Sequence, residues 1–146
     1  MSGLSWLTIL RKRENFRAAF GGFEPAVVAR FGAREVSRLM GDAGIVRNRA
    51  KIEAAINNAR RLEDRVSEFG SFGAYAWSYE PKPGSTALPP AAVAMSKYLR
   101  KRGWAFIGPT TVQSFMQAMG LVNDHVRGCA AGAEVERLRK EFVRPR

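Results

Sequence analysis

Apolar residues recur at steps of three and four along most of this chain, which is the spacing of amphipathic helices. The clearest example is KIEAAINNARRLEDRVSEFG, residues 51–70, whose final glycine predicts a helix end. Its apolar side comprises Ile52, Ala55, Ile56, Ala59, Leu62, Val66 and Phe69. The shorter stretch AREVSRLM, residues 33–40, places Val36, Leu39 and Met40 on one side. The pattern therefore predicts a helix in each stretch, joined by the glycine-containing GDAGIVRNR.

The same spacing predicts further helices on either side. TTVQSFMQAM, residues 110–119, follows Pro109, can be capped by Thr110 and is ended by Gly120. Its predicted buried stripe consists of Val112, Phe115, Met116 and Met119. AAVAMSKYLRKR, residues 91–102, directs Met95, Tyr98 and Leu99 inward. Residues 4–20 are predicted to be helical with a break near 13–15, and the Pro- and Gly-rich residues 80–90 are predicted to form a loop.

No stretch alternates with period two for long enough to predict a strand, so the predicted fold class is all-α. A chain of 146 residues suits one domain with its own core. We expect this helical domain to span residues 1–129. The basic tail, residues 130–146, is expected to form a short helix or a disordered end.

The charge narrows the range of partners. The chain has 24 Lys and Arg against 13 Asp and Glu, a formal net charge of +11. The cations cluster, mainly within residues 11–13, 47–51, 60–61, 97–102 and 137–140. Such an excess favours nucleic acid first and an anionic membrane surface second, with a solvated surface as the alternative. No run approaches eighteen consecutive apolar residues, so no membrane-spanning helix is predicted.

The single cysteine, Cys129, excludes a disulfide framework within the chain. The N-terminal order, apolar then basic, is not that of a secretory signal, so we expect a cytoplasmic protein. The only histidine, His125, precedes Cys129 by four residues, and on a helix both side chains would share one face. A structural zinc site needs four ligands. The residues alone therefore leave two interpretations open: His125 and Cys129 are half of a metal site, or their spacing is a coincidence.

Residues 33–69 contain two predicted helices joined by a tight turn, a pattern that resembles a helix-hairpin-helix. In that unit, exposed backbone amides and the start of the second helix face a DNA phosphate. Gly44 would let the backbone approach closely, and Arg47, Arg49 and Lys51 would add positive charge around it. The alternative is an ordinary helix pair, which any all-α domain can contain.

The N-terminal stretch GLSW suggests a contact with a nucleobase. An enzyme that acts on a base in duplex DNA must extrude it, stack it on a ring and fill the gap. Trp6 could supply the stacking face and Leu4 the wedge. The alternative is that Trp6, Leu7 and Leu10 are core residues of a first helix. The chain has no Walker-type phosphate loop or dinucleotide fingerprint, and neither its histidine nor its cysteine lies in a nucleophile motif.

Several long stretches together resemble one family. They are GLSWLTILRKRENFRAAF, LMGDAGIVRNRAKIEAAINNA, and LRKRGWAFIGPTTVQSFMQAMGLVNDHV with the GC that follows, and they cover roughly residues 2–129. In this order they resemble bacterial DNA-3-methyladenine glycosylase I. The resemblance implies an all-α helix-hairpin-helix fold. It also implies base excision repair, by hydrolysis of the N-glycosidic bond of 3-methyladenine in double-stranded DNA.

The resemblance assigns roles to individual residues. Trp6 matches the family's tryptophan that stacks on the flipped base, and Gly3 and Leu4 match the residues at the gap left in the DNA. The hairpin that holds the phosphate matches residues 42–51. His125 and Cys129 match two of the four ligands of a structural zinc ion in the family. The family also implies a monomer.

In the family, several dozen residues precede the GLSW motif. They contribute the other two zinc ligands, an aromatic residue of the base pocket and a glutamate that hydrogen-bonds the base. This sequence begins at Met1, directly before that motif. We therefore expect no catalytic glutamate at the matching position and weak or absent zinc binding. For the exposed N-terminal face, three outcomes stay open: partial disorder of the N-terminus, self-association through this face, or a repacked end. The alternatives to an active enzyme are a non-catalytic DNA-binding module and an inactive fragment.

Overall fold

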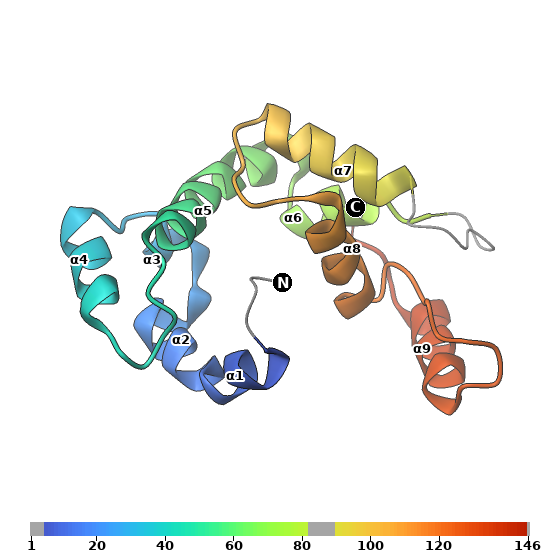
Figure 1. Cartoon of the computed structure of the whole chain (residues 1–146). Helices are drawn as coiled ribbons and strands as arrows, with labels where there is room; N and C mark the ends of the chain where they lie inside the picture. Colours follow the sequence, from blue (N-terminus) through green and yellow to red (C-terminus); the bar gives the residue numbers. More distant parts are fainter. Residues whose placement is uncertain (1–4, 82–89, 146) are drawn as a thin grey trace. The chain divides into compact units, whose positions relative to one another are not determined.

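The computed structural model describes residues 5–81 and 90–145, and every regular element within these ranges is a helix (Figure 1). The first half contains α1 (Trp6–Arg11), α2 (Arg13–Ala19), the 3-10 helix η1 (Gly21–Phe23), α3 (Pro25–Val28), α4 (Ala33–Gly41) and α5 (Arg49–Phe69). The second half contains α6 (Phe72–Trp77), α7 (Pro90–Lys101), α8 (Pro109–Ala118) and α9 (Ala130–Glu141). The predicted all-α class is confirmed.

The long periodic stretches fold as their spacing predicts. Residues 51–69 lie in α5, which ends just before Gly70, whose φ of 76° is a left-handed conformation that favours glycine. Residues 33–40 form α4, and 91–102 form most of α7. The predicted break in the first helix is real but comes at Lys12, just before the expected range. The short helices α3 and α6 were not predicted, because they are too brief to show a clear period.

Some details of the helix predictions are wrong. Gly108, not Thr110, is the N-cap of α8, and Pro109 takes the first helical position, where its missing N–H costs nothing. Met119 was assigned to the buried stripe of this helix, yet it is 56 % exposed because α8 ends at Ala118. Val66 was placed on the apolar side of α5 and is 42 % exposed.

The chain divides into two compact units. The first, here the hairpin unit, spans Met1–Asp64 and Trp104–Phe106. Its buried core joins α2, α3, α4 and the first half of α5, and comprises Ala19, Phe20, Val28, Val36, Leu39, Ile45, Ile52 and Ile56. The side-chain amide of Asn58 on α5 donates to the Ala105 carbonyl and accepts the Ala105 N–H, each at 2.9 Å. These bonds fix residues 104–106, the second segment of the hairpin unit, to α5.

The other unit, here the C-terminal unit, spans Arg65–Gly103 and Ile107–Arg146. Its core lies around α7 and α8, with Tyr75, Met95, Leu99, Met116 and Leu121 almost completely buried. A buried serine ties this pair together, because Ser96 Oγ donates to the Ile107 carbonyl at 2.7 Å. Within the described residues, no helix is long and apolar enough to span a bilayer.

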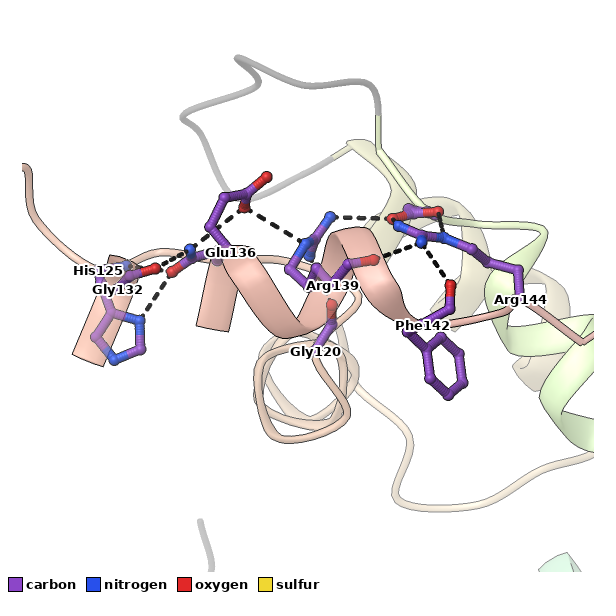
Figure 2. A network of polar contacts seen from close by, with 9 residues as sticks. Gly120, His125, Gly132, Glu136, Arg139, Phe142 and Arg144 are labelled. Atoms are coloured by element: carbon purple, nitrogen blue, oxygen red, sulfur yellow. Dashed lines mark hydrogen bonds and ion pairs between the residues drawn. The ribbon is translucent and has the colours of Figure 1, made fainter. Parts of the chain in front are cut away.

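The C-terminal tail contains α9 (Ala130–Glu141), and a helix is one of the two forms expected for residues 130–146. Figure 2 shows how polar contacts fasten it. Arg139 on α9 donates to the Gly120 carbonyl at 2.6 Å and to Glu80 at 3.0 Å. Arg144 donates to both carboxylate oxygens of Glu80, and Phe142 stacks on Trp77 with ring centroids 5.0 Å apart. The first residues after α6 therefore anchor the end of the chain.

Candidate functional site

The turn between α4 and α5 is built from residues 42–48. Ile45 is 3 % exposed and anchors the turn in the core of the hairpin unit. The Asp42 carboxylate accepts the Gly44 N–H at 2.7 Å, and the Asp42 carbonyl accepts the Ile45 N–H at 3.5 Å. Asn48 caps the following helix, since its side-chain oxygen accepts the Lys51 N–H at 3.1 Å. This cap was not predicted, although an asparagine shortly before the periodic stretch is a sequence signal for it.

The start of α5 gathers positive charge. Arg47 and Arg49 are exposed and Lys51 is half-buried, all at or just before the first turn of α5. Arg49 forms an exposed ion pair with Glu53 at 3.5 Å, and such a pair leaves its guanidinium accessible. The first amides of a helix have no intrahelical acceptor, and the helix dipole makes this end positive. The turn and the first turn of α5 together can therefore bind an anion such as a phosphate.

Gly44 packs closely against two side chains of the hairpin unit. A Cβ atom at this position would lie 2.9 Å from the Asp42 carboxylate and 3.1 Å from the Asn15 side-chain nitrogen. The predicted role of this glycine was close approach of the backbone to DNA. The structure gives it a further role, close approach of the turn to α2.

Two further residues of this site lie in the family-like stretch GLSWLTILRKRENFRAAF, but the sequence assigned neither of them a role. Lys12 donates from Nζ to the carbonyls of Ala43 and Gly44 at 2.9 and 3.1 Å. Asn15 donates from Nδ2 to the Gly44 carbonyl at 3.1 Å. An open hollow of about 370 Å³ lies beside these contacts, lined by Asn15, Ala18, Ala19, Arg38, Asp42 and Gly44. The carbonyl side of the turn is thus held by α1 and α2.

Trp6 opens α1, which Ser5 caps by accepting the Thr8 N–H at 3.2 Å. Its side chain is 68 % exposed, and those of Leu7 and Leu10 are 54 % and 45 % exposed. The alternative that these three residues belong to the core is therefore wrong for the described structure. Trp6 offers an open ring face in the same unit as the turn, and its stacking role stays a prediction. Gly3 and Leu4, assigned to the DNA gap, lie outside the described residues.

His125 and Cys129 lie in the loop that precedes α9, so helical spacing is not what brings them together. Both lie against Gly132 instead: a Cβ there would be 2.7 Å from the His125 Cβ and 3.7 Å from the Cys129 Cβ. The His125 Nδ1 atom is 2.9 Å from the Asn123 side-chain oxygen. Asn123 in turn donates to the Gly132 carbonyl at 2.9 Å (Figure 2).

This arrangement does not match a structural zinc site. Among the described residues, no three or more His, Cys, Asp or Glu side chains gather where they could hold a metal ion. One imidazole nitrogen already contacts Asn123, which leaves one nitrogen and one thiol as ligands. A structural zinc ion takes four.

Known proteins match this chain over most of its length. A sequence profile of the methyladenine glycosylase family matches residues 1–132. The chain belongs to this family. DNA-3-methyladenine glycosylase 1 of Escherichia coli K12 is 46% identical over 141 residues, which cover 88% of this chain and 74% of the relative. DNA-3-methyladenine glycosylase of Haemophilus influenzae Rd is 39% identical over 138 residues, covering 88% of this chain and 75% of the relative.

Solved structures of the methyladenine glycosylase family share the fold. The 3-methyladenine DNA glycosylase I of Staphylococcus aureus superposes with a TM-score of 0.80 at 39% identity, covering 90% of this chain and 75% of that one. The solution structure of a 3-methyladenine DNA glycosylase I superposes with a TM-score of 0.72 at 47% identity, covering 88% of this chain and 74% of that one. The resemblance read from the sequence is thus confirmed.

Proposed function

We propose that this chain is a DNA-3-methyladenine glycosylase, a hydrolase that releases 3-methyladenine from alkylated double-stranded DNA in base excision repair. The observation that carries the proposal is the 46% identity to the Escherichia coli glycosylase across 88% of this chain. The geometry supports it, because the hairpin unit combines an exposed tryptophan with a basic turn. We further propose that it acts in the cytoplasm and as a monomer.

The tryptophan supplies the step that selects the base. Extruding a base from the duplex costs a few kcal/mol, and an enzyme must recover this cost in its pocket. Stacking on an aromatic side chain is worth about 1–3 kcal/mol per base. The alkylated base carries positive charge, and a cation over a tryptophan face gains about 0.5–2 kcal/mol more. Trp6 therefore favours the damaged base over neutral adenine.

The basic turn supplies affinity without sequence preference. Phosphate contacts position a protein on the duplex but carry no base information directly. Gly44, Arg47, Arg49 and Lys51 would hold the phosphates beside the extruded nucleotide. Because the substrate base is already cationic, it leaves easily once it is bound, and recognition does much of the work that an acid does elsewhere.

The deciding experiment measures 3-methyladenine released from alkylated duplex DNA by the purified 146-residue chain. We expect release by the chain, and about tenfold to a hundredfold less by the Trp6→Ala variant, as the stacking energy implies. Binding of the duplex with a steep salt dependence but without base release would instead identify a DNA-binding module. The absence of both would leave an inactive fragment.

We propose that this chain binds zinc weakly. The described residues provide His125 and Cys129 as ligands, and a two-ligand site holds zinc far less firmly than a site of four. Equilibrium dialysis against a zinc indicator tests this directly. Stoichiometric zinc that survives a chelator of micromolar affinity would contradict it. The exposed Leu7 and Leu10 can also support self-association at high concentration, which sedimentation would detect.

A further inference from the structure

The Lys12 ammonium group holds two backbone carbonyls of the turn between α4 and α5. Lys12 is the residue between α1 and α2, serving as C-cap of the former and N-cap of the latter. Its half-buried side chain crosses to the turn and donates to two successive carbonyls, those of Ala43 and Gly44, at 2.9 and 3.1 Å. The Asn15 amide donates to the second of these carbonyls as well. Two of the three ammonium hydrogens are thereby used within the protein.

These contacts decide which way the turn's amides point. In a planar trans peptide, the carbonyl of one residue and the N–H of the next lie on opposite sides. Because the Gly44 carbonyl points to Lys12 and Asn15, the Ile45 N–H points away from them. That N–H reaches its acceptor, the Asp42 carbonyl, only at 3.5 Å, which is beyond the usual hydrogen-bond length. The Lys12 and Asn15 contacts, each 3.1 Å long, are therefore the shorter hydrogen bonds that set the orientation of this peptide.

We propose that Lys12, assisted by Asn15, is a positioning residue for DNA binding. Its ammonium group fixes the carbonyls of Ala43 and Gly44 and so holds the phosphate-binding face of the turn outward. Because Lys12 directly follows α1, it also fixes the turn relative to the helix that carries Trp6. This inference rests on the proposed function, in which the turn holds a phosphate while Trp6 stacks on the base.

The first test separates positioning from direct phosphate contact. Affinity for a duplex carrying a tetrahydrofuran abasic-site analogue is measured across a range of salt concentrations for the wild type, Lys12→Met and Lys12→Arg. We expect Lys12→Met to lose about tenfold in affinity with an unchanged slope of log affinity on log salt. Lys12→Arg keeps charge and donors and should recover most of the loss. A lysine that bound phosphate itself would lower the slope by about 0.9, and that result would overturn the proposal.

A matched variant accounts for the loss of one positive charge. Lys140 is exposed on α9, far along the chain from the turn. Lys140→Met removes the same charge without touching the Ala43 and Gly44 carbonyls. If Lys12→Met binds DNA within about twofold of Lys140→Met, the carbonyl contacts have no special role and the inference fails.

Chemical rescue tests the donor role directly. Truncation to Lys12→Ala leaves the Ala43 carbonyl without its lysine donor and the Gly44 carbonyl with Asn15 alone, next to the open hollow lined by Asn15 and Gly44. Ammonium ions can donate hydrogen bonds to these carbonyls, whereas tetramethylammonium ions cannot. At equal ionic strength, ammonium should restore duplex affinity to Lys12→Ala and tetramethylammonium should not. Equal effects of the two ions would count against the proposal.

Amide hydrogen exchange of the free protein tests the role of Lys12 without DNA and without base release. Lys12→Met and the milder Asn15→Asp should speed exchange at residues 43–46, while Lys140→Met should not. The Asn15→Asp change lies on an exposed helix position and puts a carboxylate against the Gly44 carbonyl, so it perturbs the turn without unfolding the protein. Unchanged exchange in both variants would refute the positioning role even in an active enzyme. Faster exchange with no base release by the wild type would refute only the proposed function.

Discussion

The ion-paired end of the chain gives the sharpest stability prediction. Glu80 accepts three hydrogen bonds, one from Arg139 at 3.0 Å and two from Arg144 at 2.8 and 3.1 Å. The side chains of Glu80, Arg139 and Arg144 are 23%, 15% and 37% exposed. The hydrogen bonds that Arg144 donates to Glu80 raise the pKa of Arg144, as expected for a cation that its partner stabilises. Glu80→Gln keeps the size of the side chain and removes its charge.

The expected loss follows from the burial. Hydrogen bonds to charged groups contribute about 1.5–3 kcal/mol each when buried, and exposed ion pairs contribute about 0.2–1 kcal/mol. Here the carboxylate is mostly covered, one guanidinium is nearly buried and the other is more than a third exposed. We therefore expect Glu80→Gln to lower the free energy of unfolding of the C-terminal unit by about 2–3 kcal/mol.

The measurement is urea unfolding followed by tryptophan fluorescence, since Trp77 stacks on Phe142 beside this cluster. Glu141→Gln is the matched control, because Glu141 pairs with Arg137 at 2.7 Å on the open surface of the same helix. It should cost about 0.3–0.5 kcal/mol. A double-mutant cycle of Glu80→Gln with Arg144→Met should give a coupling of about 1 kcal/mol or more. A coupling near zero, or equal losses from the two glutamine variants, would refute the reasoning.

Three further predictions test other contacts. Leu39 is 0% exposed in the core of the hairpin unit, so Leu39→Ala should lower the free energy of unfolding by about 2–5 kcal/mol. Val66 is 42% exposed, so Val66→Ala should lower it by under about 1 kcal/mol. Similar losses for the two variants in urea unfolding would contradict this difference in burial. Gly44→Ala should cost about 1–3 kcal/mol, because its Cβ collides with Asp42 and Asn15, and it should weaken duplex binding in a fluorescence anisotropy titration; unchanged affinity would speak against the tight turn. The Gly32 N–H donates to Glu35 at 2.8 Å and holds the pKa of this carboxyl below its ordinary value of 4.5. The free energy of unfolding of the wild type should therefore exceed that of Glu35→Gln fully above pH 4.5, and this difference should fall as the pH drops through the lowered pKa. A difference that grew on acidification would contradict this prediction.

Periodicity predicted the helices well because it is a local property. The apolar side of α5 and its end at Gly70 follow from residues within a few turns of one another. The clustering of Arg47, Arg49 and Lys51 at the start of this helix likewise needs only the order of the residues. Periodicity failed at Val66 and Met119, which are 42% and 56% exposed, because the spacing of apolar residues does not show whether another element covers them.

Some features of the candidate site were likewise predictable from the sequence, and others were not. The order of residues gave the basic turn, the tryptophan of GLSW and the family, since each is written in a continuous stretch. It could not show that Trp6 is open rather than buried, because exposure depends on what packs against α1. Nor could it place His125 and Cys129 in a loop around Gly132, since their spacing fits a helix equally well.

Tertiary structure alone decided which polar groups meet. Lys12 reaches a carbonyl 31 positions away, and Arg144 reaches a carboxylate 64 positions away. Neither residue stands out by type or spacing, because lysine and arginine on a basic chain are most simply read as solvated surface. Once the backbone carbonyls of the turn and the Glu80 carboxylate are held near them, an unmet hydrogen bond would be costly, and each cation acquires a fixed partner. Local spacing thus determines the helices of this protein, while long-range polar pairing determines how the basic turn before α5 and the C-terminal end are held.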